Sequence, residues 1–108
     1  MALQWQSSGT TYYAANASET AALTVPAGMF YRIRHIRLIN TNGSTQGVTL
    51  SNGTSVAAKF FRTSATKLLS GQSEDMYVPI WLTPTQSINA QTDVGNGMII
   101  TFNYDIYT

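Results

Sequence analysis

The sequence predicts an all-β fold, namely an antiparallel β-sandwich with a jelly-roll-like arrangement of seven or eight short strands. Short segments rich in β-branched and aromatic residues alternate between apolar and polar positions, which is the pattern of half-buried strands. Turn signals built from glycine, proline and asparagine separate these segments, and no long helix is predicted. With 108 residues, the chain has the length of one domain with a single hydrophobic core.

The longest apolar-rich run spans residues 20–41 and carries half of the lysine and arginine residues. It is predicted to form two strands, at residues 21–25 and 29–39, joined by a Pro-Ala-Gly turn at residues 26–28. A helix is the competing interpretation, but the β-branched and aromatic residues of this run favour strands.

The second of these strands changes its apolar face partway along. Ile33 lies on one face, whereas Ile36 and Leu38 have the opposite parity. A single extra residue turns every later side chain of a strand to the other face. We therefore predict a β-bulge near Arg34 and His35, which would return the apolar residues to one side.

Five further strands are expected, at residues 47–51, 54–61, 76–82, 88–92 and 98–107. Asn52-Gly53 is expected to join the first two of them in a hairpin, and residues 95–97 to form a hairpin turn before the last. Pro79 indicates that its strand lies at a sheet edge or contains a bulge. Residues 62–74 are expected to form a loop or a single helical turn.

Residues 1–18 are expected to form an N-terminal arm, and residues 19–108 a single β-sandwich domain. The arm is polar and uncharged, yet it contains Trp5, Tyr12 and Tyr13. Because aromatic side chains need a surface against which to be buried, we predict that the arm docks on a neighbouring subunit. A loosely ordered arm is the alternative, and Tyr12 and Tyr13 would also suit the start of a short edge strand.

The composition excludes several classes of function. Charged residues make up 10% of the chain, less than half of the usual ~25%, so uncharged polar residues must supply much of the surface. A net charge of +1 gives no long-range field for steering to nucleic acid or acidic membranes. The absence of cysteine excludes disulfides, thiolate catalysis and zinc-thiolate sites. No signal-peptide pattern or apolar run of about 20 residues is present, so a soluble chain made in the cytoplasm is expected.

No catalytic constellation is apparent in the sequence. His35 is the only histidine, and no serine, cysteine or carboxylate near it in sequence completes a recognisable triad. Glu74 and Asp75 are adjacent, so in a strand they would face opposite ways and could not act as a pair across a cleft. We therefore expect no enzymatic activity, no metal site and no cofactor.

Arg32, Arg34 and Arg37 form a basic strand face that could bind single-stranded nucleic acid or a protein partner. The protein partner is favoured, because only three arginines are involved and the net charge is near zero. All lysines and arginines lie in residues 32–67, and four of the five acidic residues follow them. If this segregation survives folding, copies of the chain could dock head to tail around a ring.

Aromatic residues raise the further hypothesis of a sugar-stacking platform, for which the candidates are Trp5, Tyr12, Tyr13, Trp81 and Tyr107. Trp81 has apolar neighbours on both sides and is instead expected in the core. Trp5 and Tyr107, near the two ends of the chain, are the better candidates for exposure.

Parts of the chain resemble small virion proteins of tailed bacteriophages. Residues 25–28, Val-Pro-Ala-Gly, form a turn that leads into a strand, which ends in an Asn-Thr loop at residues 40–41, as in that family. The Leu-Thr-Pro of residues 82–84 and the Ile-Asn-Ala-Gln of residues 88–91 resemble the second half of the pattern. The chain has Pro-Thr-Gln at residues 84–86, where the family often has an Ala-Gly-Asp turn.

The resemblance implies a β-sandwich used as a structural part of a virus particle, without catalytic residues. We therefore expect a non-enzymatic capsid decoration (cement) protein that is made in the host cytoplasm and incorporated into the virion. Its expected partners are the major capsid protein and copies of itself, as a homotrimer. The expected interface residues are Trp5, Tyr12, Tyr13, Arg32, Arg34 and Arg37. The alternative is a glycan- or receptor-binding β-sandwich module of a phage tail appendage.

Overall fold

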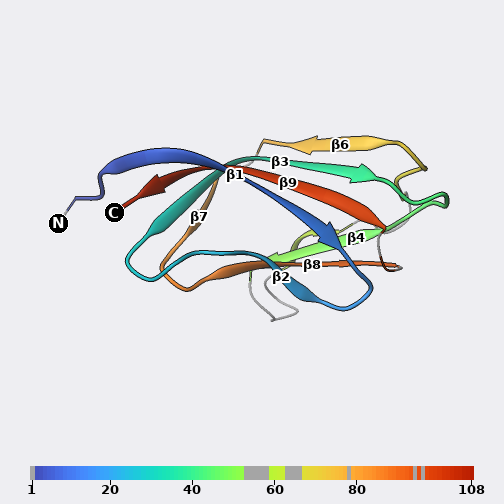
Figure 1. Cartoon of the computed structure of the whole chain (residues 1–108), viewed down its shortest axis with the longest axis horizontal. Coiled ribbons are helices and arrows are strands. Elements are labelled where there is room, and N and C mark those ends of the chain that lie inside the picture. The colour runs from blue at the N-terminus through green and yellow to red at the C-terminus, as the bar shows by residue number, and fades with distance from the viewer. Residues whose placement is uncertain (1, 53–58, 63–66, 78, 94, 96) are drawn as a thin grey trace.

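The structure is a computed structural model that describes residues 2–52, 59–62, 67–77, 79–93, 95 and 97–108, with residues 59–62 described by their backbone alone. These residues form nine strands in two sheets stacked face to face (Figure 1). In chain order the strands are β1 Trp5–Ala15, β2 Thr20–Thr24, β3 Phe30–Asn40, β4 Val48–Asn52, β5 Lys59–Arg62, β6 Ser73–Met76, β7 Ile80–Leu82, β8 Ser87–Thr92 and β9 Met98–Tyr107.

The order of the strands is that of a jelly roll. The five-stranded sheet has the order β1-β9-β3-β6, with β7 also paired to β3, and the four-stranded sheet has the order β2-β8-β4-β5. The antiparallel pairs are nested along the chain: β1 with β9, β2 with β8, β3 with β6 and β7, and β4 with β5. A long antiparallel ribbon that folds over itself gives this order. The predicted antiparallel sandwich with a jelly-roll-like arrangement is confirmed.

The connection between β2 and β3 carries the chain from one sheet to the other. Its turn is closed by the Met29 N–H, which donates to the Pro26 carbonyl oxygen at 3.3 Å. Gly28 has a φ of 80°, a conformation that glycine adopts without a steric penalty. The predicted turn at residues 26–28 is therefore confirmed.

The predicted β-bulge is also present. The register of β3 against β9 shifts between Ile33 and His35, so Arg34 is the extra residue. Beyond the shift, Ile36 and Leu38 face the core and are buried. The bulge thus keeps the apolar residues of both halves of β3 on one side of the sheet.

Two other parts of the prediction are wrong. Residues 95–97 do not join a hairpin, because β8 and β9 lie in different sheets; residue 96 itself lies outside the described residues. The single strand expected at residues 76–82 is two strands, β6 and β7, with Pro79 between them. Proline has no N–H to donate to a strand ladder, which accounts for the break.

The antiparallel pairing expected between strands at residues 47–51 and 54–61 is confirmed by β4 and β5. Gly53 of the expected turn and residues 54–58 of the second expected strand lie outside the described residues. The segment expected as a loop or helical turn at residues 62–74 contains the start of β6, a short and exposed strand. Its polar sequence reflects a position at the edge of the sheet, where few residues reach the core.

Residues assigned by sequence to an N-terminal arm form β1 in the structure. Ten residues of β1 pair with β9, so the segment is a long edge strand of the five-stranded sheet. The end of the chain is held beside it, because Gln4 and Thr108 exchange two backbone hydrogen bonds of 2.9 and 3.0 Å. Apolar alternation is weak in β1 because an edge strand contacts the core along only part of its length. Deleting residues 2–18 would therefore remove a strand that covers one side of β9.

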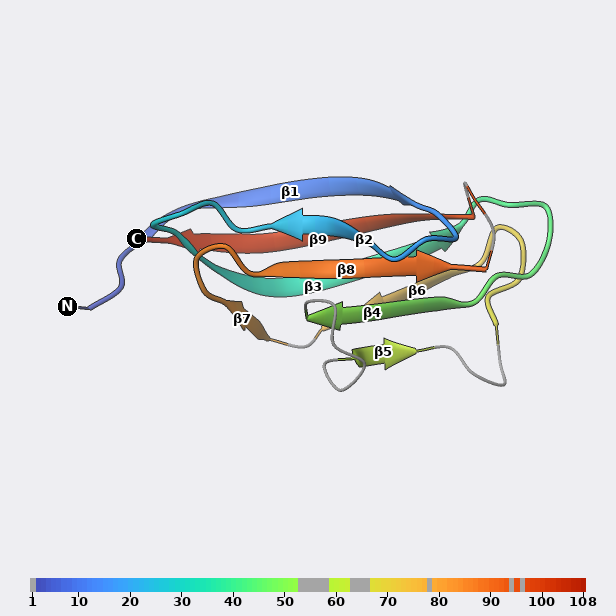
Figure 2. The same cartoon turned by 90° about the horizontal axis from the view of Figure 1, so that it is seen from below.

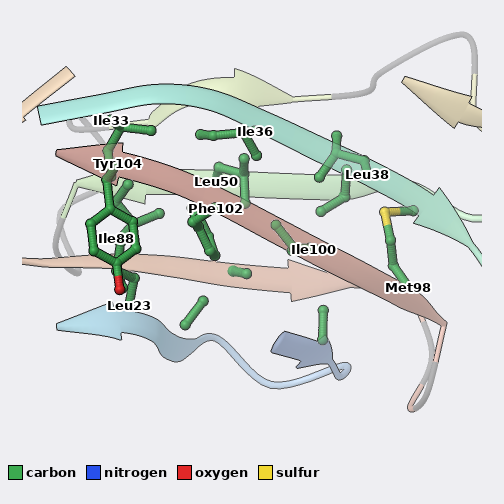
Figure 3. Close-up of a cluster of buried hydrophobic side chains, with 14 of the residues drawn as sticks. Leu23, Ile33, Ile36, Leu38, Leu50, Ile88, Met98, Ile100, Phe102 and Tyr104 are labelled. Atoms are coloured by element: carbon green, nitrogen blue, oxygen red, sulfur yellow. The ribbon is translucent and has the colours of Figure 1, made fainter. Parts of the chain in front are cut away.

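The hydrophobic core lies between the two sheets and is built around β9 (Figure 3). Met98, Ile100, Phe102 and Tyr104 project into it from alternate positions of β9. Ile33, Ile36 and Leu38 of β3 lie beside them in the same sheet. Leu50 and Ile88 face them from the four-stranded sheet. Among the described residues, every buried side-chain nitrogen and oxygen has a hydrogen-bond partner.

β1 is fixed to this core by a glycine–tyrosine contact. Gly9 pairs with Tyr104, and a Cβ atom at Gly9 would lie 2.6 Å from Cε2 of that ring. The ring has little freedom to move, because it stacks on Tyr31 at a centroid distance of 4.4 Å. The hydroxyl groups of Tyr104 and Thr11 are also hydrogen bonded at 2.8 Å. Only a residue without a side chain fits at this position.

We predict that Gly9→Ala lowers the free energy of unfolding by about 1–3 kcal/mol, the usual cost of overpacking. Gly43→Ala is the matched control, because a Cβ atom there meets nothing within 4 Å, and it should change stability by less than about 0.5 kcal/mol. Urea unfolding followed by circular dichroism measures both. Equal stability of the two variants would contradict the packing of Tyr104 beneath β1.

Candidate protein-interaction face

The face of the five-stranded sheet that points away from the core gathers arginine, histidine, carboxylate and aromatic side chains. We call it the outer face; it comprises the outward-pointing residues of β1, β9, β3, β6 and β7. Alternation along the strands determines which side chains reach it. On β9, for example, Asn103, Asp105 and Tyr107 point outward and alternate with Phe102, Tyr104 and Ile106, which point toward the core.

A row of hydrogen bonds crosses four strands of the outer face. Thr10 Oγ1 donates to Asn103 Oδ1 at 2.8 Å, and Asn103 Nδ2 lies 2.9 Å from His35 Nδ1. His35 Nε2 lies 2.8 Å from Asp75 Oδ1, and the ring of Tyr77 stacks on the imidazole at 4.8 Å. Because the Asn103 amide donates to Nδ1, the imidazole hydrogen is placed on Nε2, where it is donated to Asp75. The row joins β1, β9, β3 and β6.

A second polar group on the outer face is centred on Asp105. Ser8 Oγ donates to Asp105 Oδ1 at 2.9 Å, and Arg34 Nε lies 3.2 Å from the same oxygen. Arg34 reaches this position because it is the extra residue of the bulge, so that Arg34 and its neighbour His35 both reach the outer face.

The other two arginines of β3 lie on the same face. Arg32 stands in register with Asp105 on β9 and with Trp81 on β7. Arg37 stands in register with Asp75 on β6. Strand β3 therefore places three guanidinium groups along the middle of the outer face, with carboxylates on the neighbouring strands.

Large aromatic side chains are exposed beside these charges. Trp81 is 49% exposed, and its ring packs against Tyr107 with 5.1 Å between centroids. Trp5 stands in register with Tyr107 and is 58% exposed, and Tyr12 further along β1 is 72% exposed. The outer face thus combines rigid aromatic rings with arginines held on a sheet.

The structure brings together five of the six residues that the sequence analysis named as an interface: Trp5, Tyr12, Arg32, Arg34 and Arg37. Tyr13 lies on the opposite side of β1. There its ring packs partly against the core, and its hydroxyl is hydrogen bonded to the Thr20 hydroxyl.

Sequence reasoning missed other members of the outer face. Trp81 was expected in the core, which is wrong: Ile80 and Leu82 point inward, so alternation turns Trp81 outward. Asn103 could have been found from the same alternation on β9. The hydrogen bond between His35 and Asp75 could not have been predicted from alternation, because 40 residues separate the two in the chain.

The charge segregation seen in the sequence does not survive folding. Arg34 pairs with Asp105, and Lys67 Nζ lies 2.7 Å from Asp93 Oδ2. Hydrogen bonds from Lys67 and from the Gly47 N–H lower the pKa of Asp93 below its usual value. Basic and acidic side chains are therefore intermixed, and the hypothesis of head-to-tail docking through oppositely charged edges is wrong for the described residues.

The polar groups of the outer face hold strands together. Each ring nitrogen of His35 has a hydrogen-bond partner on a neighbouring strand, and Ser8 on β1 donates a hydrogen bond to Asp105 on β9.

In the described part of the chain, no cluster of three or more histidine and carboxylate side chains could hold a metal ion. Across the same residues, no helix has the length and apolar character needed to cross a membrane.

Comparison with known proteins identifies the fold. No protein-family model and no curated protein sequence matches the chain. In structure, the chain is similar to a chain in the acidic stable capsid structure of Helicobacter pylori bacteriophage KHP30, with a TM-score of 0.63. The match covers 99% of this chain and 92% of the other, at 11% sequence identity. The likeness establishes that the two chains share a fold along almost their whole length.

We predict that Asp75→Ala lowers the free energy of unfolding by about 0.5–1.5 kcal/mol, because the hydrogen bond to His35 is lost. The amide protons of β6 should also exchange faster, since this bond ties β6 to β3. Glu74→Ala is the matched control, because Glu74 is the adjacent, exposed carboxylate and faces away from the row. Its effect should stay below about 0.5 kcal/mol in the same urea titration. Equal effects would show that the row does not anchor β6.

Proposed function

We propose that this chain is a non-enzymatic virion structural protein, specifically a capsid decoration (cement) protein that bridges and stabilises neighbouring shell subunits. The observation that carries the proposal is the likeness in fold, over 99% of the chain, to a chain of a bacteriophage capsid structure. The resemblance of residues 25–28 and the following strand to small virion proteins supports the same role. The proposed partners are the major capsid protein and further copies of the chain, for which the resemblance implies a homotrimer.

The outer face is the proposed contact with the shell. Arginine and aromatic residues are enriched at the centres of protein interfaces, where they supply most of the binding energy. Here Arg37, Tyr12 and Trp81 are presented on strands, so binding would order few flexible groups. The two polar groups centred on His35 and Asp105 hold the surface in one arrangement.

Weak individual contacts are sufficient for this role. A decoration protein acts in many copies on one shell, so each contact need contribute only a few kcal/mol to the stability of the particle. A low content of charged residues also suits a chain whose surface is covered by neighbours.

A second candidate function, glycan binding at a tail appendage, is favoured by one observation. Trp81 and Tyr107 form an aromatic pair on the outer face, with Trp5 in register beside it. Aromatic faces of this kind stack on sugar rings. The decoration role does not require sugar binding, so a glycan-array measurement separates the two candidates.

Quantitative mass spectrometry of virus particles purified from the source of the chain tests the proposed role. We expect a copy number close to that of the major shell protein, because a decoration protein covers the capsid lattice. A few copies per particle would overturn the decoration role and favour a neck or tail position with glycan binding. Absence from particles would overturn the structural role altogether.

We predict that Tyr12→Ala and Arg37→Ala each weaken binding to undecorated particles at least about tenfold, as for residues at the centre of an interface. Thr24→Ala is the control, because Thr24 is exposed on the four-stranded sheet. Co-sedimentation of the purified variants with particles measures the effect, and circular dichroism confirms that each variant is folded. Unchanged binding by both variants would exclude the outer face as the contact.

A further inference from the structure

β1 leaves one long edge of the five-stranded sheet open. It is the terminal strand of the sheet and pairs with β9 on one side only. No other strand of the described residues lies along its second side, and Figure 2 shows β1 along one border of the molecule. The backbone N–H and C=O groups on that side are therefore available for pairing with another strand.

From Ser7 to Ala15, β1 has none of the features that usually protect an open edge. Natural edge strands are short, or carry lysine, proline or a bulge that prevents pairing with another chain. β1 has 11 residues, and its sequence, WQSSGTTYYAA, contains neither a charged residue nor a proline. Its register with β9 is regular from Ser7 to Ala15, and the one irregularity lies at the start of the strand, between Trp5 and Ser7. Such an edge is suited to occupation by a strand.

We propose that the occupant is β1 of a second copy, paired antiparallel about a two-fold axis at Thr10. Thr10 is the midpoint of Trp5–Ala15, and this register pairs residues 7–13, which lie beyond the irregularity at Trp5, with the same residues of the second copy. Residues equally far from the midpoint then face each other, and large side chains meet small ones: Tyr12 lies opposite Ser8, and Tyr13 opposite Ser7.

Self-pairing of this kind is favoured by the absence of charge. An antiparallel pair of identical strands places residues at equal distances from the axis opposite each other, so a charged residue at the midpoint would face its own copy. At the axis, two Thr10 side chains would stand side by side, a favourable cross-strand pair. The two five-stranded sheets would become continuous, and their outer faces would lie on one surface.

This inference rests on the edge of β1 and not on the proposed function. A two-fold pair is a closed dimer, whereas the resemblance to small virion proteins implies a trimer. If the chain is a decoration protein, the dimer would offer two outer faces to the shell and bind with higher avidity. The mass of the free protein distinguishes the two assemblies without any particle.

A single cysteine tests the register, because the chain has no cysteine of its own. Facing residues of an antiparallel pair have Cα atoms about 4.5–5.5 Å apart, within the range of about 4.4–6.8 Å that a disulfide spans. Thr10→Cys should therefore form a disulfide-linked dimer with oxidised glutathione. Ser8→Cys is the matched control on the same strand and face, because its two copies would stand roughly 14 Å apart. Equal cross-linking of the two variants would overturn the proposed axis.

Charge substitutions test the association itself. Sedimentation equilibrium should give a dimer for the natural chain and a dissociation constant at least about tenfold higher for Thr10→Lys, because two ammonium groups would face each other. Mixing Thr10→Lys with Thr10→Glu should restore the dimer, which a general loss of folding would not allow. A monomeric or trimeric natural chain would overturn the pairing and leave the proposed virion role standing. A dimeric chain that is absent from virus particles would support the pairing and overturn that role.

Discussion

Strand β9 pairs with β1 on one side and with β3 on the other, and its side chains alternate between the core and the outer face. Phe102 and Tyr104 fill the space between the sheets, while Asn103 and Asp105 organise the polar groups on the other side. A shift of one residue in this strand would bury both polar residues and expose both rings. The hydrophobic core therefore determines the register of β9, and through it the arrangement of the outer face.

The bulge in β3 has a comparable effect on the outer face. Without the extra residue Arg34, either Ile33 or Ile36 would have to leave the core. With it, Arg34 and His35 reach the same side of the sheet from adjacent positions, one directed to Asp105 and the other to Asn103. The irregularity that preserves apolar burial thus also brings a guanidinium and an imidazole onto one surface.

Local periodicity predicted the features of the fold that depend on short stretches of chain. The limits of β9, the turn at residues 26–28 and the bulge all follow from alternation and turn chemistry. Alternation does not reveal which of two sheets a strand joins, so it predicts a hairpin of β8 and β9, although the two strands lie in different sheets. Most of β1 was not predicted as a strand. An edge strand needs no continuous apolar face, so its polar residues show little apolar alternation. The contacts of His35 needed the register between β3 and its neighbours, which no single segment contains.

The proposed association of β1 depends on how firmly the core holds that strand. The ring of Tyr104 lies beneath Gly9, and its hydroxyl is hydrogen bonded to Thr11. Thr10, between them, is bonded on the outer face to Asn103. Strand β1 is thus anchored from both faces at its midpoint, where the two-fold axis would pass. An edge held in the extended conformation loses little conformational freedom when it pairs, so more of the hydrogen-bonding free energy contributes to association. The contact between Gly9 and the Tyr104 ring, which holds β1 against the core, would thus also hold its open edge in the conformation that pairs with a second copy.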